Sequence, residues 1–155
     1  MKNRTFPAWY DELHQRLSAM AEHLQEQVTG WQVGGETITP EDLGYPGGLA
    51  TASIQAAIDK AAENGGGTVL IRSDMVTGTL VMKSHVRLMI AEGARLMAST
   101  DLADFPEHIC QRITVQDTHM GMNQALIFAE GCENICLCGP GEIDGRGTQD
   151  NFPGG

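Results

Sequence analysis

Two acidic side chains near the end of the printed sequence, Glu142 and Asp144, have the types and the spacing of a carboxylate pair. Side chains of an extended strand alternate between its two faces, so residues two apart lie on the same face. Two carboxyl groups can hydrolyse a glycosidic bond, one as acid and the other as base. However, Gly145 follows Asp144, and aspartate at such a bend commonly bonds its own backbone. We expect this turn role for Asp144.

Three of the four cysteines, Cys132, Cys136 and Cys138, are close enough in sequence to raise the question of a metal site. Their spacing lacks the CxxC pattern of zinc sites, and no histidine stands near them. Cys136 and Cys138 share one face of a strand. We therefore expect small thiols buried inside the fold, with no metal and no cofactor.

One arginine, Arg112, lies in a long polar segment that covers residues 99–123. Arginine can hold a carboxylate through two parallel hydrogen bonds, so Arg112 could bind an acidic sugar. A solvated loop arginine is the alternative. His108 and His119 in the same segment are eleven residues apart without a third ligand, and they predict no metal site. Arg112 is the single predicted substrate-binding residue.

Two helices are predicted ahead of the strands. The first covers residues 8–28, where apolar side chains recur every three or four residues, and we expect it to pack on its own domain or, alternatively, on a partner. Residues 30–50 form a glycine- and proline-rich connector. The second helix covers about 51–64, with Thr51 or Ser53 as its cap. Its apolar face would cover the first strands of a stack and hide their unpaired edges.

From residue 68 onward the pattern is one of short strands separated by turns. The strand-length segments are 68–71, 79–82, 86–90, 94–98, 125–129, 135–138 and 142–144. Ile71, Leu80, Leu88 and Leu96 are nine, eight and eight residues apart. No crossover helix fits into such short connections, so the spacing predicts a repeating, mainly β winding. We expect a helical extension at 1–35 and a β-winding domain at 36–155.

The charge balance limits the partners. The formal net charge is −10, whereas nucleic-acid binding needs a basic surface, so no nucleic-acid partner is expected. The same charge repels an anionic polysaccharide at long range unless a local basic site exists. No run of about 18 apolar residues predicts a membrane span. The first residues lack the apolar run of a signal peptide, so we expect a cytoplasmic protein with free thiols.

Four segments in order resemble the amino-terminal part of glycoside hydrolase family 28, the polygalacturonases. They are SIQAAIDKAAENGGGTVLI, GTLVMKSHVRLMIAEGARLMAST, DLADFP and LIFAEGCENICLCGPGEIDGRG, which lie between Ser53 and Gly147. The resemblance implies a right-handed, single-stranded parallel β-helix, here incomplete. It also implies inverting hydrolysis of galacturonan in pectin.

The catalytic and binding motifs of that family are Asn-X-Asp, Asp-Asp, Gly-His-Gly and Arg-X-Lys, and none of them occurs in residues 1–155. We therefore assign no catalytic residue and expect an amino-terminal portion of a polygalacturonase-like enzyme that is inactive alone. The expected partner of the whole enzyme is pectin or an oligogalacturonide.

Two alternatives stay open. The chain could be a non-catalytic β-solenoid that binds glycans or assembles with other chains, since strands at an open end can pair with another chain and allow self-association. A pectate or rhamnogalacturonan lyase shares the β-helix, but no acidic calcium cluster is evident in the sequence, and we rank it last.

Overall fold

The computed structural model describes residues 12–13, 15–20, 34–107 and 124–148. The chain divides into two units, Met1–Gln32 and Val33–Gly155. In the first unit, residues 12–13 and 15–20 are helical, and the remainder of the helix predicted over 8–28 lies outside the described residues. Its packing partner and the predicted boundary at residue 35 stay predictions. Within the described ranges, no helix combines the length and the apolar character that crossing a bilayer requires.

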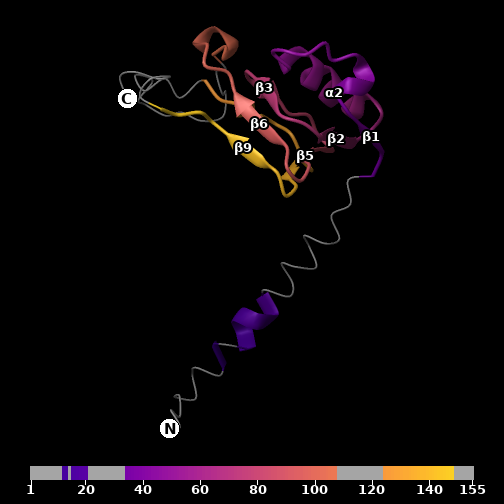
Figure 1. Cartoon of the computed structure of the whole chain (residues 1–155). Coiled ribbons are helices and arrows are strands. Elements are labelled where there is room, and N and C mark those ends of the chain that lie inside the picture. Colours follow the sequence, from indigo (N-terminus) through magenta and orange to yellow (C-terminus); the bar gives the residue numbers. More distant parts are fainter. Residues whose placement is uncertain (1–11, 14, 21–33, 108–123, 149–155) are drawn as a thin grey trace. The chain divides into compact units, whose positions relative to one another are not determined.

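The second unit consists of short strands that stack into three sheets (Figure 1). The first sheet has the order β1 (Glu36–Ile38), β2 (Gly67–Ile71), β5 (Val86–Ile90) and β8 (Cys136–Cys138). The second contains β3 (Met75–Thr77), β6 (Arg95–Ala98) and β9 (Glu142–Asp144). The third contains β4 (Leu80–Val81) and β7 (Ile127–Phe128). All pairings between these strands are parallel.

The chain visits the three sheets in turn, and one circuit is called a coil below. β2, β3 and β4 make one coil, β5, β6 and β7 make the next, and β8 and β9 begin another. The register keeps equivalent positions aligned, because Val69 pairs with Leu88 and Leu88 pairs with Leu137. The structure thus confirms the prediction in outline: the unit is mainly β, with the stacked parallel strands of a partial parallel β-helix.

The eight- and nine-residue spacing has a different meaning from a coil repeat. Ile71 and Leu88 belong to the first sheet, Leu80 to the third and Leu96 to the second. The spacing therefore measures steps around a coil, from one sheet to another. Two strands, β1 and β3, were missed by the sequence analysis because glycines around β1 and the polar residues before β3 read as turns.

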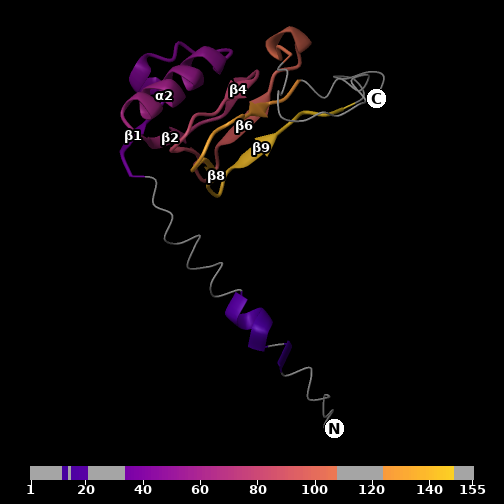
Figure 2. The ribbon, with the colours of Figure 1, turned by 180° about the vertical axis from the view of Figure 1, so that it is seen from behind.

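Helix α2 (Thr51–Glu63) lies at the β1–β2 end of the stack, and β8 and β9 lie toward the other end (Figures 1 and 2). Its predicted apolar face is fully buried against the strands, through Ile54, Ala57, Ile58 and Ala61. The predicted cap is wrong: Ala50 is the N-cap residue and makes no side-chain cap. Thr51 Oγ1 instead accepts a hydrogen bond from the backbone N–H of Gly78 at 2.7 Å.

The edge of β4 that β7 does not cover is satisfied by a side chain of α2. Gln55 accepts from Val81 N–H at 2.9 Å through Oε1 and donates to the Val81 carbonyl at 3.0 Å through Nε2. An unpaired strand edge offers these groups to other chains, so pairing them with an amide side chain closes the edge. The amide of Gln55 thus pairs the N–H and the carbonyl of Val81 on this edge of β4.

The core fills the space between the three sheets and α2. In β5 the side chains of Val86, Leu88 and Ile90 are buried, whereas Arg87 and Met89 are half-buried on the outer face. The period of two follows from strand geometry. Paired residues of parallel strands point the same way, so this alternation in β5 tells which side chains of β8 face inward and which face outward.

Candidate functional site

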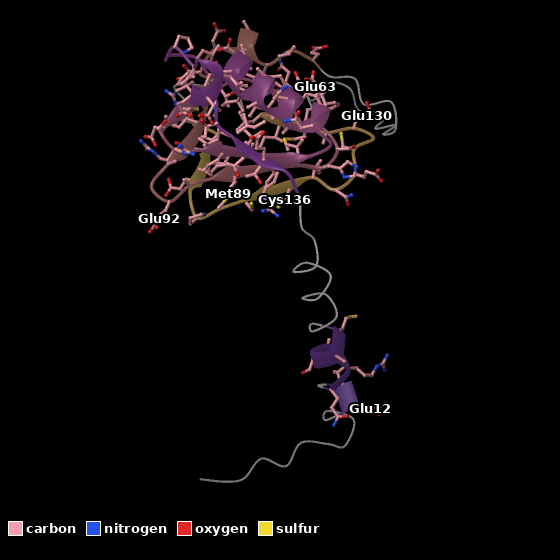
Figure 3. The ribbon with its side chains drawn as sticks, turned by 90° about the vertical axis from the view of Figure 1, so that its right-hand side faces the viewer. Glu12, Glu63, Met89, Glu92, Glu130 and Cys136 are labelled. Atoms are coloured by element: carbon pink, nitrogen blue, oxygen red, sulfur yellow. The ribbon has the colours of Figure 1, made fainter. Side chains whose placement is uncertain are left out.

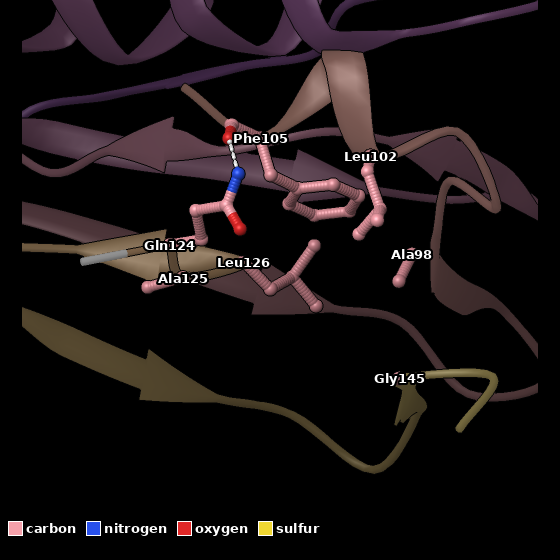
Figure 4. Close-up of a pocket in the computed structure, with 7 residues that line it drawn as sticks. All are labelled: Ala98, Leu102, Phe105, Gln124, Ala125, Leu126 and Gly145. Atoms are coloured by element: carbon pink, nitrogen blue, oxygen red, sulfur yellow. Dashed lines mark hydrogen bonds between the residues drawn. The ribbon is translucent and has the colours of Figure 1, made fainter. Parts of the chain in front are cut away.

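A recess of about 290 Å³ opens where the chain leaves β6 and later enters β7 (Figure 4). Its lining is mainly apolar and consists of Ala98, Leu102, Phe105, Gln124, Ala125, Leu126 and Gly145. These residues come from the end of β6, the short helix η2 (Leu102–Asp104), the approach to β7 and the turn after β9. Segments far apart in the sequence therefore meet at one place.

Polar side chains fix the segment around η2. Asp101 accepts a hydrogen bond from Ala103 N–H at 2.9 Å, and Ser99 Oγ donates to Asp104 Oδ2 at 2.5 Å. The carbonyl of Asp104 accepts from Thr79 N–H at 3.1 Å, which ties η2 to the strand region of the preceding coil. Residues Leu102 and Phe105 are thereby held over the recess.

Gln124 closes one side of the recess. Its Nε2 donates to the Phe105 carbonyl at 2.7 Å, and this bond joins two residues that are 19 positions apart in the chain (Figure 4). None of the seven lining residues in the described part of the chain is titratable, so these residues offer no acid or base. Apolar surface with a few polar groups is typical of a binding site, and that is the chemistry the recess can provide.

A basic side chain, Arg146, lies next to the recess. Its Nη1 donates to the carbonyl of Ala98, a lining residue, at 3.3 Å, and its backbone N–H donates to Asp144 Oδ1 at 2.8 Å. The second bond confirms the predicted turn role of Asp144. Arg146 was not among the predicted site residues, although it follows Asp144 and Gly145 directly in the sequence.

Glu142 and Asp144 lie on the same, outer face of β9. They pair in register with Arg95 and Met97, while Ile143 between them pairs with the fully buried Leu96. Arg95 donates to the Asp74 carboxylate through Nε at 3.1 Å and through Nη2 at 2.5 Å. The hydrogen bond to Asp74, and the negative charges of Asp74, Glu142 and Asp144, raise the pKa of Arg95. The two carboxylates of β9 therefore lie beside a cation.

The Asp74–Arg95 pair leads to a pH prediction. The hydrogen bond from Arg95 holds the pKa of Asp74 below its ordinary value of 3.8. Because the folded-state pKa is lowered, the pair stabilises the fold at pH values above 3.8, and this contribution is lost as the pH falls through the lower folded-state value. In a carbon-detected NMR titration, we expect Asp74 to titrate below 3.8 and to move upward in R95M. An unchanged midpoint in R95M would show that Arg95 does not hold this carboxylate.

The cysteines are placed differently from the prediction. Cys136 pairs with Arg87 and Cys138 with Met89, both of which are on the outer face of the first sheet. Neither thiol is buried inside the stack, and both are half-buried. The prediction of buried internal thiols is wrong, because Leu137 takes the inward position next to Leu88. Cys132 Sγ, elsewhere, bonds the Met82 carbonyl at 3.3 Å.

Arg112, the predicted substrate-binding residue, lies outside the described residues, together with His108, Cys110 and His119. Its role stays a prediction. Among the residues that are described, no group of three or more His, Cys, Asp and Glu side chains is arranged to hold a metal ion.

Comparisons with known proteins give similarity at the level of structure. No family model and no curated protein matches the sequence. A protein from Parabacteroides merdae, provisionally named a glycosyl hydrolase, is 32% identical with a TM-score of 0.59 over 71% of this chain and 44% of its own. A family 28 exopolygalacturonase from Yersinia enterocolitica is 27% identical with a TM-score of 0.61, over 72% of this chain and 21% of its own.

A third similar structure, a hyperthermoactive exopolygalacturonase from Thermotoga maritima, is 19% identical with a TM-score of 0.64, over 84% of this chain and 30% of its own. At this sequence identity, the similarity concerns the fold alone. The shares covered show that this chain spans less than half the length of each of the three structures. Together they support a glycoside hydrolase-like chain whose fold is that of the polygalacturonases.

Proposed function

We propose that this chain is the amino-terminal portion of a polygalacturonase-like hydrolase. In the whole enzyme it would support inverting hydrolysis of galacturonan, and residues 1–155 alone would be inactive. The observation that carries the proposal is the stack of parallel coils closed by α2, which has the fold of two exopolygalacturonases. The four matching sequence segments run through the same coils, and a right-handed winding is part of the proposal.

The described residues suit a supporting role better than a catalytic one. Asp144 is hydrogen-bonded to Arg146 N–H within its own turn, and the carboxylates of β9 are next to Arg95. An inverting glycosidase needs two carboxyl groups about 6.5–9.5 Å apart on opposite sides of a sugar. Glu142 and Asp144 lie on one face of one strand instead, so they cannot flank a sugar in this way.

The recess and Arg146 would bind the carbohydrate. The ring of Phe105 and the side chain of Leu102 supply an apolar surface, and the guanidinium of Arg146 supplies a positive charge beside it. A uronate has an apolar ring face and a carboxylate, so both features are complementary to it. Arg112 remains a proposed second contact for the carboxylate.

The test is reducing-sugar release from polygalacturonate. We expect none from the purified 155-residue chain above a heat-treated control. A longer chain encoded by the same reading frame, if it carries the missing aspartate motifs, should release product from the same substrate. Release by the 155-residue chain would contradict the inactivity, and a longer frame without those motifs would contradict the enzyme itself.

A specific observation favours the second candidate, an assembly module. Leu137 and Ile143 occupy inward-facing positions but are 47% and 45% exposed. Apolar side chains at such positions can be covered by another chain that adds strands to the stack. Light scattering on the same purified chain separates the two candidates: a defined oligomer supports assembly, and a monomer supports the enzyme portion.

A further inference from the structure

Three sulfur atoms gather on the outer face of the first sheet, away from the recess. Cys136 and Cys138 are two apart on β8 and therefore project from the same face. The register pairs Cys138 with Met89 of β5, and Met89 also points outward. Met89 and Cys136 are labelled along the same lower border of the second unit in Figure 3. All three side chains are half-buried and within reach of solutes.

The two thiols share one face of β8, beside Arg87 and Met89 of β5. Burial, followed by the hydrogen bond with Cys136 and the charge of Cys136, raises the pKa of Cys138, whereas the positive charge of Arg87 acts in the opposite direction. Arg87 is the register partner of Cys136, and its buried Nε has no hydrogen-bond partner. An unpaired buried donor favours negative charge nearby, so Arg87 is placed to stabilise thiolates at this position.

A disulfide does not suit this pair. Residues two apart on a strand are separated by about 6.6 Å between Cα atoms, with parallel Cα–Cβ bonds. Disulfides need Cβ atoms about 3.5–4.5 Å apart, so the backbone would have to move. Two thiolates that bind one metal ion can be farther apart than the two sulfurs of a disulfide. At about 2.3 Å from a three-coordinate ion, the two sulfurs are about 4 Å from each other. Rotation of the two side chains about their Cα–Cβ bonds can bring the sulfurs to that separation without a backbone movement.

We propose that Cys136, Cys138 and Met89 form a binding site for a soft monovalent metal ion of the Cu⁺ type. Thiolate and thioether ligands select Cu⁺, whereas Zn²⁺ in structural sites takes four ligands in a tetrahedron. Binding one Cu⁺ releases the two thiol protons and transfers no electron. The resulting bis-thiolate complex carries one negative charge, which the guanidinium of Arg87 balances.

The site does not depend on hydrolase activity, so it can be tested on the purified chain. Under anaerobic conditions, Cu⁺ is titrated against a chromophoric Cu⁺ chelator, and X-ray absorption identifies the ligand atoms. We expect one Cu⁺ per chain with sulfur-only coordination. The double variant C136S/C138S should bind at least about 100-fold more weakly, and M89L about 10-fold more weakly.

The matched control is C110S/C132S, which removes the other two thiols and should bind Cu⁺ as the parent chain does. Circular dichroism shows whether each variant is folded. Undiminished affinity in C136S/C138S, or loss of affinity in C110S/C132S, would overturn the site. Tighter binding of Zn²⁺ than of Cu⁺ would overturn the proposed class of ion.

Discussion

L88A is expected to lower the free energy of unfolding by about 2–5 kcal/mol. Leu88 is fully buried, and in the register it lies between Val69 and Leu137 at the centre of the first sheet. Removing its side chain eliminates apolar contacts and leaves a cavity between coils that cannot collapse without shifting two strands. Urea unfolding followed by circular dichroism measures the loss.

The matched control is L137A, the same substitution one coil further along the same sheet. Leu137 also points inward but is 47% exposed, so less apolar surface is removed from water at this position. We expect a loss of about 1 kcal/mol or less. Equal losses in the two variants would show that Leu137 is buried in solution, for example by association of the chain.

The second large effect is expected from G139A, in the turn between β8 and β9. Gly139 has φ of +109°, a conformation that side chains rarely adopt. A Cβ atom there would overlap the backbone carbonyl of Ile90 in the preceding coil. Strain of about 1 kcal/mol and overpacking of about 1–3 kcal/mol should both act. We expect earlier unfolding in urea and faster amide exchange in β8 and β9.

G131A separates the two causes. Gly131 also has a positive φ, +64°, but a Cβ atom on it would meet nothing within 4 Å. This variant should therefore lose only about 1 kcal/mol, from backbone strain. If G139A costs no more than G131A, the close approach between the turn and Ile90 does not exist in solution.

The local elements of this chain could be predicted because their signals are short in range. Alternating apolar residues marked Val86–Ile90, and the predicted strand coincides with β5. The apolar face of α2 was visible from residue spacing in the same way. By contrast, β3 was missed because the strand has only three residues, Met75–Thr77, and polar residues precede it. Its strand conformation depends on pairing with β6, which comes later in the chain.

The candidate site was beyond prediction for a similar reason. Phe105 and Gln124 line one recess although 19 positions separate them, and a side-chain hydrogen bond joins them. The spacing of residues along the sequence does not show that two distant residues are close in the folded chain. Arg146 was visible in the sequence, but its closeness to the recess depends on Ala98, 48 positions earlier.

The sequence by itself determined that the chain forms short strands, that α2 has one apolar face, and that Cys136 and Cys138 project from the same face of a strand. Only the tertiary structure decided which face that is. Because side chains of a strand project alternately to its two faces, Leu137 lies on the face opposite to the two cysteines. This alternation does not show which face points to the interior. Pairing with β5 decides it, because Leu137 joins the buried Leu88, and the thiols are left outside next to Met89.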